Sequence, residues 1–152
     1  MGAIRLEIRC MIPSDYDQVY ELWLRTPGVG LNSVDDSREG ITRYLLRNPE
    51  TCFVALRGHT VIGVILSGHD GRRGYVYHMA VDVEERRQGI GDRLLASALN
   101  ALRAQGIAKI ALLAFRKNGI GNSFWDKKGF SIRDDVLYRD FVLMPGIDVR
   151  PS

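Results

Sequence analysis

The sequence of 152 residues lacks the features of several large protein classes. No apolar run approaches the length of a membrane span, and Arg5, Glu7 and Arg9 stand where a signal peptide would be apolar. The only two cysteines, Cys10 and Cys52, lie in strand-like apolar surroundings, which favours buried thiols over a disulfide. We therefore expect a cytoplasmic protein that is not embedded in a membrane.

Signatures of metal binding and of nucleic-acid binding are also missing. The three histidines, His59, His69 and His78, are scattered through the chain, so no metal site is expected. The net charge of +3 is mild, and no basic stripe with interleaved aromatic residues is present, which argues against nucleic acid as a partner. The charge does suit a phosphorylated cofactor. The contents of 45% hydrophobic and 26% charged residues are ordinary for one globular domain, expected over residues 1–152.

Residues 75–95 predict a strand that turns through glycines into a helix. Residues 75–81 are apolar and aromatic, and apolar residues recur at helical spacing from Ile90 onward. Gly89 and Gly91 have no Cβ, so a bulky phosphate can approach the main chain of the turn closely. Free backbone N–H groups and the positive end of the helix dipole coincide there. We interpret this turn as a cradle for a diphosphate.

The rest of the chain alternates between strand and helix patterns. Seven runs are strand-like: residues 4–9, 52–56, 61–66, 75–81, 109–115, 130–133 and 136–143. Four helical patterns begin near Ser14, Asp35, Gly89 and Asn122. The resulting order βααβββαβαββ predicts a mixed α/β (α+β) fold with one mostly antiparallel sheet of six to seven strands and about four helices. The core covers about residues 4–143, and a short C-terminal tail follows.

The turn also carries a family resemblance. Residues Arg86–Gly91 match the (Gln/Arg)-x-x-Gly-x-(Gly/Ala) signature of the GNAT superfamily of N-acetyltransferases. The run Tyr77–Asp82 and the later Asn118 and Gly129-Phe130 fall where that family has its other motifs. A short motif is specific only in its structural setting, and here the strand–turn–helix setting agrees. The chain thus resembles this superfamily, and within it the ribosomal-protein-alanine acetyltransferase-like members.

The resemblance implies the GNAT fold, whose sheet is splayed in the middle, and an acetyl-CoA-dependent N-acetyltransferase. The pyrophosphate of acetyl-CoA would lie on the turn, and the main chain of Met79 and Val81 would hydrogen-bond the pantetheine arm. The cofactor-binding residues implied in this way are Met79, Ala80, Val81, Arg86, Arg87, Gln88, Gly89, Ile90, Gly91, Asp92, Asn118 and Trp125. The acetyl group would move directly to a primary amine of a small molecule or of a peptide or protein N-terminus.

The family's usual acid and base are replaced in this sequence. A tyrosine that protonates the leaving thiolate in many members is Trp125 here, and indole does not give up its proton. Two frequent positions of the base map near Val76 and to Leu113, neither of which accepts a proton. The candidates that remain are Tyr77, His78 and a chain of waters. Because adjacent strand residues alternate, only one of Tyr77 and His78 is expected to face the cleft.

The missing base bears on the acceptor. Near pH 7.4 a lysine amine is about a thousandth neutral and an α-amine roughly a quarter neutral, so an acceptor of low pKa is favoured. The segments expected to set substrate choice are residues 26–36 and 136–138. Asp35 and Asp36 either attract a cationic amine or cap the second helix. Family members often dimerise, which leaves a homodimer open.

Two other functions compete with this interpretation. A module that senses acyl-CoA without catalysing a reaction would explain why the acid tyrosine and the carboxylate bases are missing here. Release of thiol in the presence of a panel of amines would distinguish an enzyme from such a sensor. A dinucleotide-binding domain is excluded because the full three-glycine fingerprint is missing and the turn follows several antiparallel strands.

Overall fold

The computed structural model of the chain describes residues 4–144 and 149–150. The elements are β1 (Leu6–Cys10), a 3-10 turn (Pro13–Asp15), α1 (Tyr16–Leu24), β2 (Leu31–Asn32), α2 (Arg38–Arg47), β3 (Phe53–Arg57), β4 (Thr60–His69), β5 (Gly74–Val81), a 3-10 turn (Val83–Glu85), α3 (Ile90–Ala104), β6 (Ile110–Leu112), α4 (Gly119–Lys127) and β7 (Val149–Arg150). No helix among the described residues is long and apolar enough to span a membrane.

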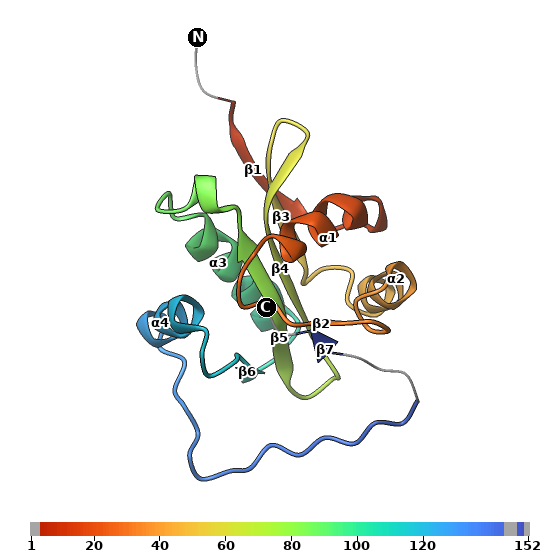
Figure 1. Cartoon of the computed structure of the whole chain (residues 1–152), viewed down its shortest axis with the longest axis vertical. Coiled ribbons are helices and arrows are strands. Elements are labelled where there is room, and N and C mark those ends of the chain that lie inside the picture. The colour runs from red at the N-terminus through yellow and green to blue at the C-terminus, as the bar shows by residue number, and fades with distance from the viewer. Residues whose placement is uncertain (1–3, 145–148, 151–152) are drawn as a thin grey trace.

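One sheet organises the molecule, with five strands in the order β1-β3-β4-β5-β6. The pairs β1–β3, β3–β4 and β4–β5 are antiparallel, and only β5–β6 is parallel. Helices α1 and α2 cover one face, and α3 and α4 lie on the other (Figure 1). The predicted mixed α/β fold, with a mostly antiparallel sheet and four helices, is confirmed.

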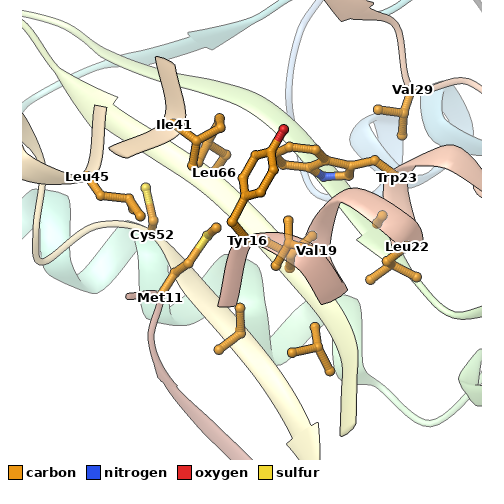
Figure 2. Close-up of a cluster of buried hydrophobic side chains, with 14 of the residues drawn as sticks. Met11, Tyr16, Val19, Leu22, Trp23, Val29, Ile41, Leu45, Cys52 and Leu66 are labelled. Carbon is orange, nitrogen blue, oxygen red and sulfur yellow. The ribbon is translucent and has the colours of Figure 1, made fainter. Parts of the chain in front are cut away.

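The face beneath α1 and α2 holds the larger core cluster. Val19, Leu22 and Trp23 recur at helical spacing, so one stripe of α1 faces the sheet and is buried. Figure 2 shows these side chains gathered with Tyr16 and Cys52. Each such side chain contributes about 1.5–3 kcal/mol when fully buried. Burial raises the pKa of the Cys52 thiol to about 12, so this cysteine remains a protonated core residue.

Helix α3 buries an apolar stripe against the opposite face of the sheet. The stripe comprises Ile90, Leu94, Leu95, Ala98 and Leu102. The helix ends where Gly106 adopts a φ of 81°, the left-handed conformation that glycine tolerates best. Burial of the apolar stripe holds the N-terminus of α3 near the end of β5, where the predicted cradle lies.

Strands β5 and β6 pair at one end only. Gly74, Tyr75 and Val76 lie opposite residues 110–112, and no described strand pairs with this edge of β5 from Tyr77 onward. The two strands therefore diverge towards the head of α3, and the predicted splay of the sheet is confirmed. Backbone N–H and C=O groups along that part of β5 are left facing the gap.

The two closing strands predicted at residues 130–133 and 136–143 are absent, and the prediction of six to seven strands in the sheet was too high. Residues 130–144 contain no helix or strand and are mostly exposed. Figure 1 shows this part of the chain leaving α4 as a long arc away from the sheet. The alternating sequence favours a strand, but a strand also needs a paired neighbour, and no described strand lies beside this segment. The short strands β2 and β7 form a separate antiparallel pair.

Candidate active site

The turn between β5 and α3 presents main-chain donors. Gly89 is the N-cap of α3 with a φ of 75°, and Arg87 has a φ of 65°, so both adopt the left-handed conformation. Within residues 4–144 and 149–150 no side chain caps this helix, so the N–H groups of its first turn are open to an anion. A Cβ on Gly91 would come within 3.3 Å of Phe124 Cε1, so glycine lets α4 pack closely on the first turn of α3, whereas a Cβ on Gly89 would meet nothing within 4 Å. The geometry suits a diphosphate.

Ion pairs hold the turn in place on the sheet. Arg25 Nη2 lies 3.0 Å from Asp82 Oδ2, and the Glu84 N–H donates to Asp82 Oδ1 at 3.1 Å. These contacts, first the backbone bond and then Arg25, lower the pKa of Asp82. Arg57 donates to Glu85 Oε2 at 2.9 Å and to Gln88 Oε1 at 2.6 Å. Both ends of the turn are thus anchored by charged groups outside it.

A cavity of about 1120 Å³ runs from this turn into the gap between β5 and β6. Eleven of the twelve residues proposed to bind the cofactor line it: Met79, Ala80, Val81, Arg86, Arg87, Gly89, Ile90, Gly91, Asp92, Asn118 and Trp125. The exception is Gln88, whose side chain is bound to Arg57 instead. The cleft therefore joins the glycine turn to the open edge of β5.

Two residues of α4 form the opposite wall. Asn118 is the N-cap of α4, where its Oδ1 accepts from Gly121 N at 3.0 Å. A Cβ on Gly28, whose φ is 92°, would lie 2.4 Å from Asn118 Nδ2, so this glycine allows residues 26–30 to approach α4. Trp125 packs edge-on against Phe124 and Phe130, with ring centroids 5.0 Å apart in each pair. Trp125 thus lines the cleft and also packs against its aromatic neighbours.

A β-bulge brings both candidate bases to the cleft. Leu66 pairs with His78 and the next residue, Ser67, pairs with Val76, which leaves Tyr77 as the extra residue on β5. Both Tyr77 and His78 line the cavity. The prediction that strand alternation would place them on opposite faces was wrong, because a bulge interrupts the alternation.

His78 forms a partly buried pair with Asp36 from the loop before α2. His78 Nε2 lies 2.9 Å from Asp36 Oδ1, and the two side chains are 13% and 7% exposed. Asp36 Oδ2 accepts from the Asn32 N–H at 2.8 Å, and Tyr16 Oη donates to the Asp36 carbonyl at 2.7 Å. The His78 and Trp23 rings also pack edge to face, with centroids 5.0 Å apart. These contacts hold both ring and carboxylate in one orientation.

The sequence did not reveal this role of Asp36. Neither aspartate caps α2: the N-cap is Ser37, whose side chain accepts from Gly40 N at 3.0 Å. The capping interpretation of Asp35 and Asp36 was therefore wrong. The sequence offered one signal, since Asp36 is the second of two acidic residues that follow Asn32. Nothing local indicated that Asp36 would meet His78 on β5, 42 positions away.

Three tyrosines gather at the far end of the cleft. Tyr77 stacks on Tyr75 with centroids 5.3 Å apart and meets Tyr44 edge-on at 5.6 Å. Burial, together with Tyr75 and Asp35, raises the pKa of Tyr77, so its hydroxyl stays protonated at neutral pH. Burial likewise raises the pKa of Tyr44. Tyr77 can therefore donate a hydrogen bond there, whereas a phenolate base is disfavoured.

Comparison with known proteins settles the family. The model of the acetyltransferase (GNAT) family matches residues 16–130. This chain belongs to the GNAT family of acetyltransferases. An acetyltransferase of Sodalis glossinidius is 32% identical over 132 residues, which is 87% of this GNAT chain and 92% of that protein.

Two solved structures share its fold. The N-acetyltransferase PaiA of Thermoplasma acidophilum, in complex with coenzyme A, superposes with a TM-score of 0.72 at 21% identity, over 86% of this chain and 92% of that one. A ribosomal-protein-alanine N-acetyltransferase of Brucella melitensis gives a TM-score of 0.63 at 16% identity, over 92% and 99% of the two chains. The GNAT fold predicted from the sequence is confirmed.

Proposed function

We propose that the protein is an N-acetyltransferase that moves an acetyl group directly from acetyl-CoA to a primary amine. One observation carries the proposal: a single cleft joins an uncapped helix N-terminus, an open strand edge and the His78–Asp36 pair. The first two features suit the donor, and the third suits proton transfer from an acceptor amine. The coenzyme A complex of the structural relative PaiA supports the choice of donor.

The donor would be held mainly by the main chain. The first-turn N–H groups of α3 would bind the pyrophosphate, with Arg86 and Arg87 adding positive charge. The edge of β5 at Met79 and Val81 would pair with the two amides of pantetheine, as it would with another strand. A β5 N–H near Val81 would stabilise the oxyanion that forms when the amine attacks the thioester.

His78 is the proposed general base. If its Nε2–H donates to Asp36, the lone pair on Nδ1 is left to accept the proton of the attacking amine. Asp36 would hold this tautomer and orient the ring. Tyr77, protonated at neutral pH, is assigned to hydrogen-bond donation instead of base catalysis.

A base at this position widens the range of acceptors. The preference for an α-amine was inferred from the lack of a dedicated base, and His78 with Asp36 would remove that restriction. Peptide N-termini, small-molecule amines and lysine side chains are then all candidates. The ribosomal-protein-alanine type of acceptor is one member of this set.

A thiol-release assay tests the proposed function. Purified protein with acetyl-CoA is offered separately an α-amino peptide, a lysine peptide and small diamines, and free thiol is measured over time. Amine-dependent release supports the proposal. Tight binding of acetyl-CoA without release from any acceptor class would contradict it and favour a sensor of acyl-CoA.

A cytoplasmic location and a homodimer belong to the same proposal. The proposed use of acetyl-CoA as donor supports the cytoplasmic location, and cell fractionation tests it. The exposed apolar residues after α4 support the dimer.

A further inference from the structure

Two arginines of α2 line the cleft without an ion-pair partner. Arg43 and Arg47 both border the cavity, and in the part of the chain that the structure describes neither guanidinium forms an ion pair. Glu39 stands four residues before Arg43, the spacing at which helical ion pairs form, yet the two do not pair. Arg38, at the start of the same helix, does pair with a carboxylate of α1. The two cations in the cleft are therefore available to a ligand.

The spacing of the two arginines favours an anion between them. Arg43 and Arg47 lie one turn apart on the side of α2 that borders the cleft. Like charges at this spacing destabilise a helix because they repel one another. An anion that binds both guanidinium groups would relieve the repulsion, and the planar guanidinium matches a carboxylate through paired N–H donors. The pair is thus suited to an anionic group of a ligand.

Helix α2 runs along β5 in the opposite direction. Its start lies beside His78, which Asp36 contacts just before the helix. Its end lies beside the start of β5, because Asn48 Oδ1 accepts from the His69 N–H at 2.9 Å and His69 pairs with Gly74. The arginines of α2 therefore lie on the side of the cleft away from the glycine turn, which we term the acceptor side. An anion bound there would belong to the acceptor and not to coenzyme A.

Charges of opposite sign mark the two ends of the acceptor side. The carboxylate of Asp36 lies 2.9 Å from His78, the proposed base, and favours a cationic amine. Arg43 and Arg47 lie further along α2, about 7 and 13 Å from its first residue at 1.5 Å per residue. An acceptor that joins the two ends spans roughly 10 Å, the length of about three residues of extended peptide.

The wall between these two ends is aromatic. Tyr77 is 54% exposed, Tyr75 stacks on it and Tyr44 packs edge-on against it, and all three line the cavity. Flat aromatic faces suit the planar amides and the apolar side chains of a peptide. The Tyr77 hydroxyl, protonated at neutral pH because its pKa is raised, can donate to a peptide carbonyl.

We propose that the preferred acceptor is a peptide whose free amine reaches His78 and whose carboxylate, about three residues further on, binds between Arg43 and Arg47. The carboxylate is either the acidic side chain of the third residue or the C-terminus of a tripeptide, since both place the same group at a similar distance from the amine. The assignment rests on the proposed acetyl transfer, to which it adds the class of acceptor. The His78–Asp36 pair would act on the amine, and the arginines would select the peptide.

Matched acceptors test the role of the carboxylate. Thiol release is measured with two tetrapeptide amides that differ only in glutamate or glutamine at the third position, and with a tripeptide acid and its amide. A peptide with the carboxylate should show a KM about 10-fold lower than its neutral partner at similar kcat, because exposed ion pairs contribute modestly. A preference in only one of the two pairs supports the proposal and identifies the source of the carboxylate. Equal KM values within both pairs would overturn it.

Arginine variants test whether α2 carries this preference. In Arg43→Gln/Arg47→Gln the KM of the glutamate peptide should rise about 10-fold, and in Arg43→Glu/Arg47→Glu a peptide with lysine at the third position should become the better acceptor. A variant that merely failed to fold could not gain this new preference. Arg103→Gln changes an exposed arginine of α3 outside the cleft and should keep the original preference. An unchanged preference in both double variants would refute the role of the arginines.

Binding without turnover separates the class of acceptor from the proposed reaction. The same peptides are titrated by calorimetry into protein saturated with coenzyme A, which carries no acetyl group to transfer. The glutamate peptide should bind about 10-fold more tightly than the glutamine peptide, and the difference should shrink at high salt, which screens exposed charges. Failure of every acceptor to release thiol would contradict the reaction alone. Equal affinities of the two peptides, or acetylation of small diamines but of no peptide, would refute the class of acceptor alone.

Discussion

The two ends of the cleft are built in different ways. At the head of α3 the main chain supplies the donors, and glycines allow a ligand to approach them. Around His78 the side chains supply the chemistry, and they come from α1, the loop before α2 and the bulge in β5. A site made of main chain needs one local sequence, whereas a site made of side chains needs several distant segments in register. Substitutions at the head of α3 should therefore weaken the binding of coenzyme A, whereas substitutions around His78 should lower turnover.

The largest effect is expected at the main-chain end. Gly89→Val/Gly91→Val would force a branched residue into a left-handed conformation at 89 and block the approach to the first turn of α3. Loss of two charge-assisted contacts, each about 1.5–3 kcal/mol, would weaken coenzyme A binding by roughly 100-fold or more. Isothermal titration calorimetry measures this loss, and circular dichroism checks the fold.

Gly71→Val is the matched control for the glycine variant. Gly71 has a φ of 96° in the β4–β5 turn, and a Cβ there would meet nothing within 4 Å. It carries a similar backbone strain away from the cleft, so its affinity for coenzyme A should be unchanged. Equal losses in both variants would mean that strain, and not the cradle, weakens binding.

The next effect is expected at the side-chain end. His78→Gln should lower kcat by about 10²- to 10⁴-fold, the usual contribution of a general base, without changing the Kd for coenzyme A. The loss should be greater for a lysine acceptor than for an α-amine, because the lysine must lose a proton in almost every encounter. Steady-state kinetics with both acceptors measures the difference. His59→Gln, in the exposed β3–β4 turn, is the control, and an unchanged kcat in the His78 variant would return the base role to water or Tyr77.

A smaller loss is expected when the partner of His78 is changed. The amide of Asp36→Asn can donate to Nε2, which would move the ring proton to Nδ1 and remove the acceptor that faces the amine. We expect a fall in kcat of roughly 10²-fold with little change in KM. Asp35→Asn removes the same charge from the exposed neighbour and should have little effect. Equal losses in the two variants would indicate that charge alone matters and that Asp36 does not position His78.

The smallest effect is expected at Trp125. Because indole does not donate its proton to a leaving thiolate, Trp125→Phe should change kcat only slightly and chiefly lower the melting temperature. Thermal unfolding and thiol release on the same samples measure the two effects. A large fall in kcat at unchanged stability would show that Trp125 takes part in the reaction.

The sequence predicted the main-chain end well and the side-chain end poorly. Gly89 and Gly91 in a strand–turn–helix setting indicate the uncapped helix start directly. Tyr77 and His78 were named as candidates, but the bulge that brings both to the cleft leaves no local signal in the pattern. Asp35 and Asp36 were both candidates for the cap of the second helix, because acidic residues before a helix often cap it, and nothing local singled out Asp36. The closing strands were predicted from alternation, which indicates that a segment can form a strand but not which edge it will pair with.

The amino-acid sequence by itself determined the elements of the sheet up to β6, the four helices and the glycine turn, since each depends on periodicity or on backbone freedom within a few residues. Only the tertiary structure decided where β5 and β6 part, which two side chains meet at His78 and Asp36, and that residues 131–144 leave the sheet. These features depend on contacts between residues far apart in the chain. Such contacts form only when the whole fold brings distant segments together, and no local pattern encodes them.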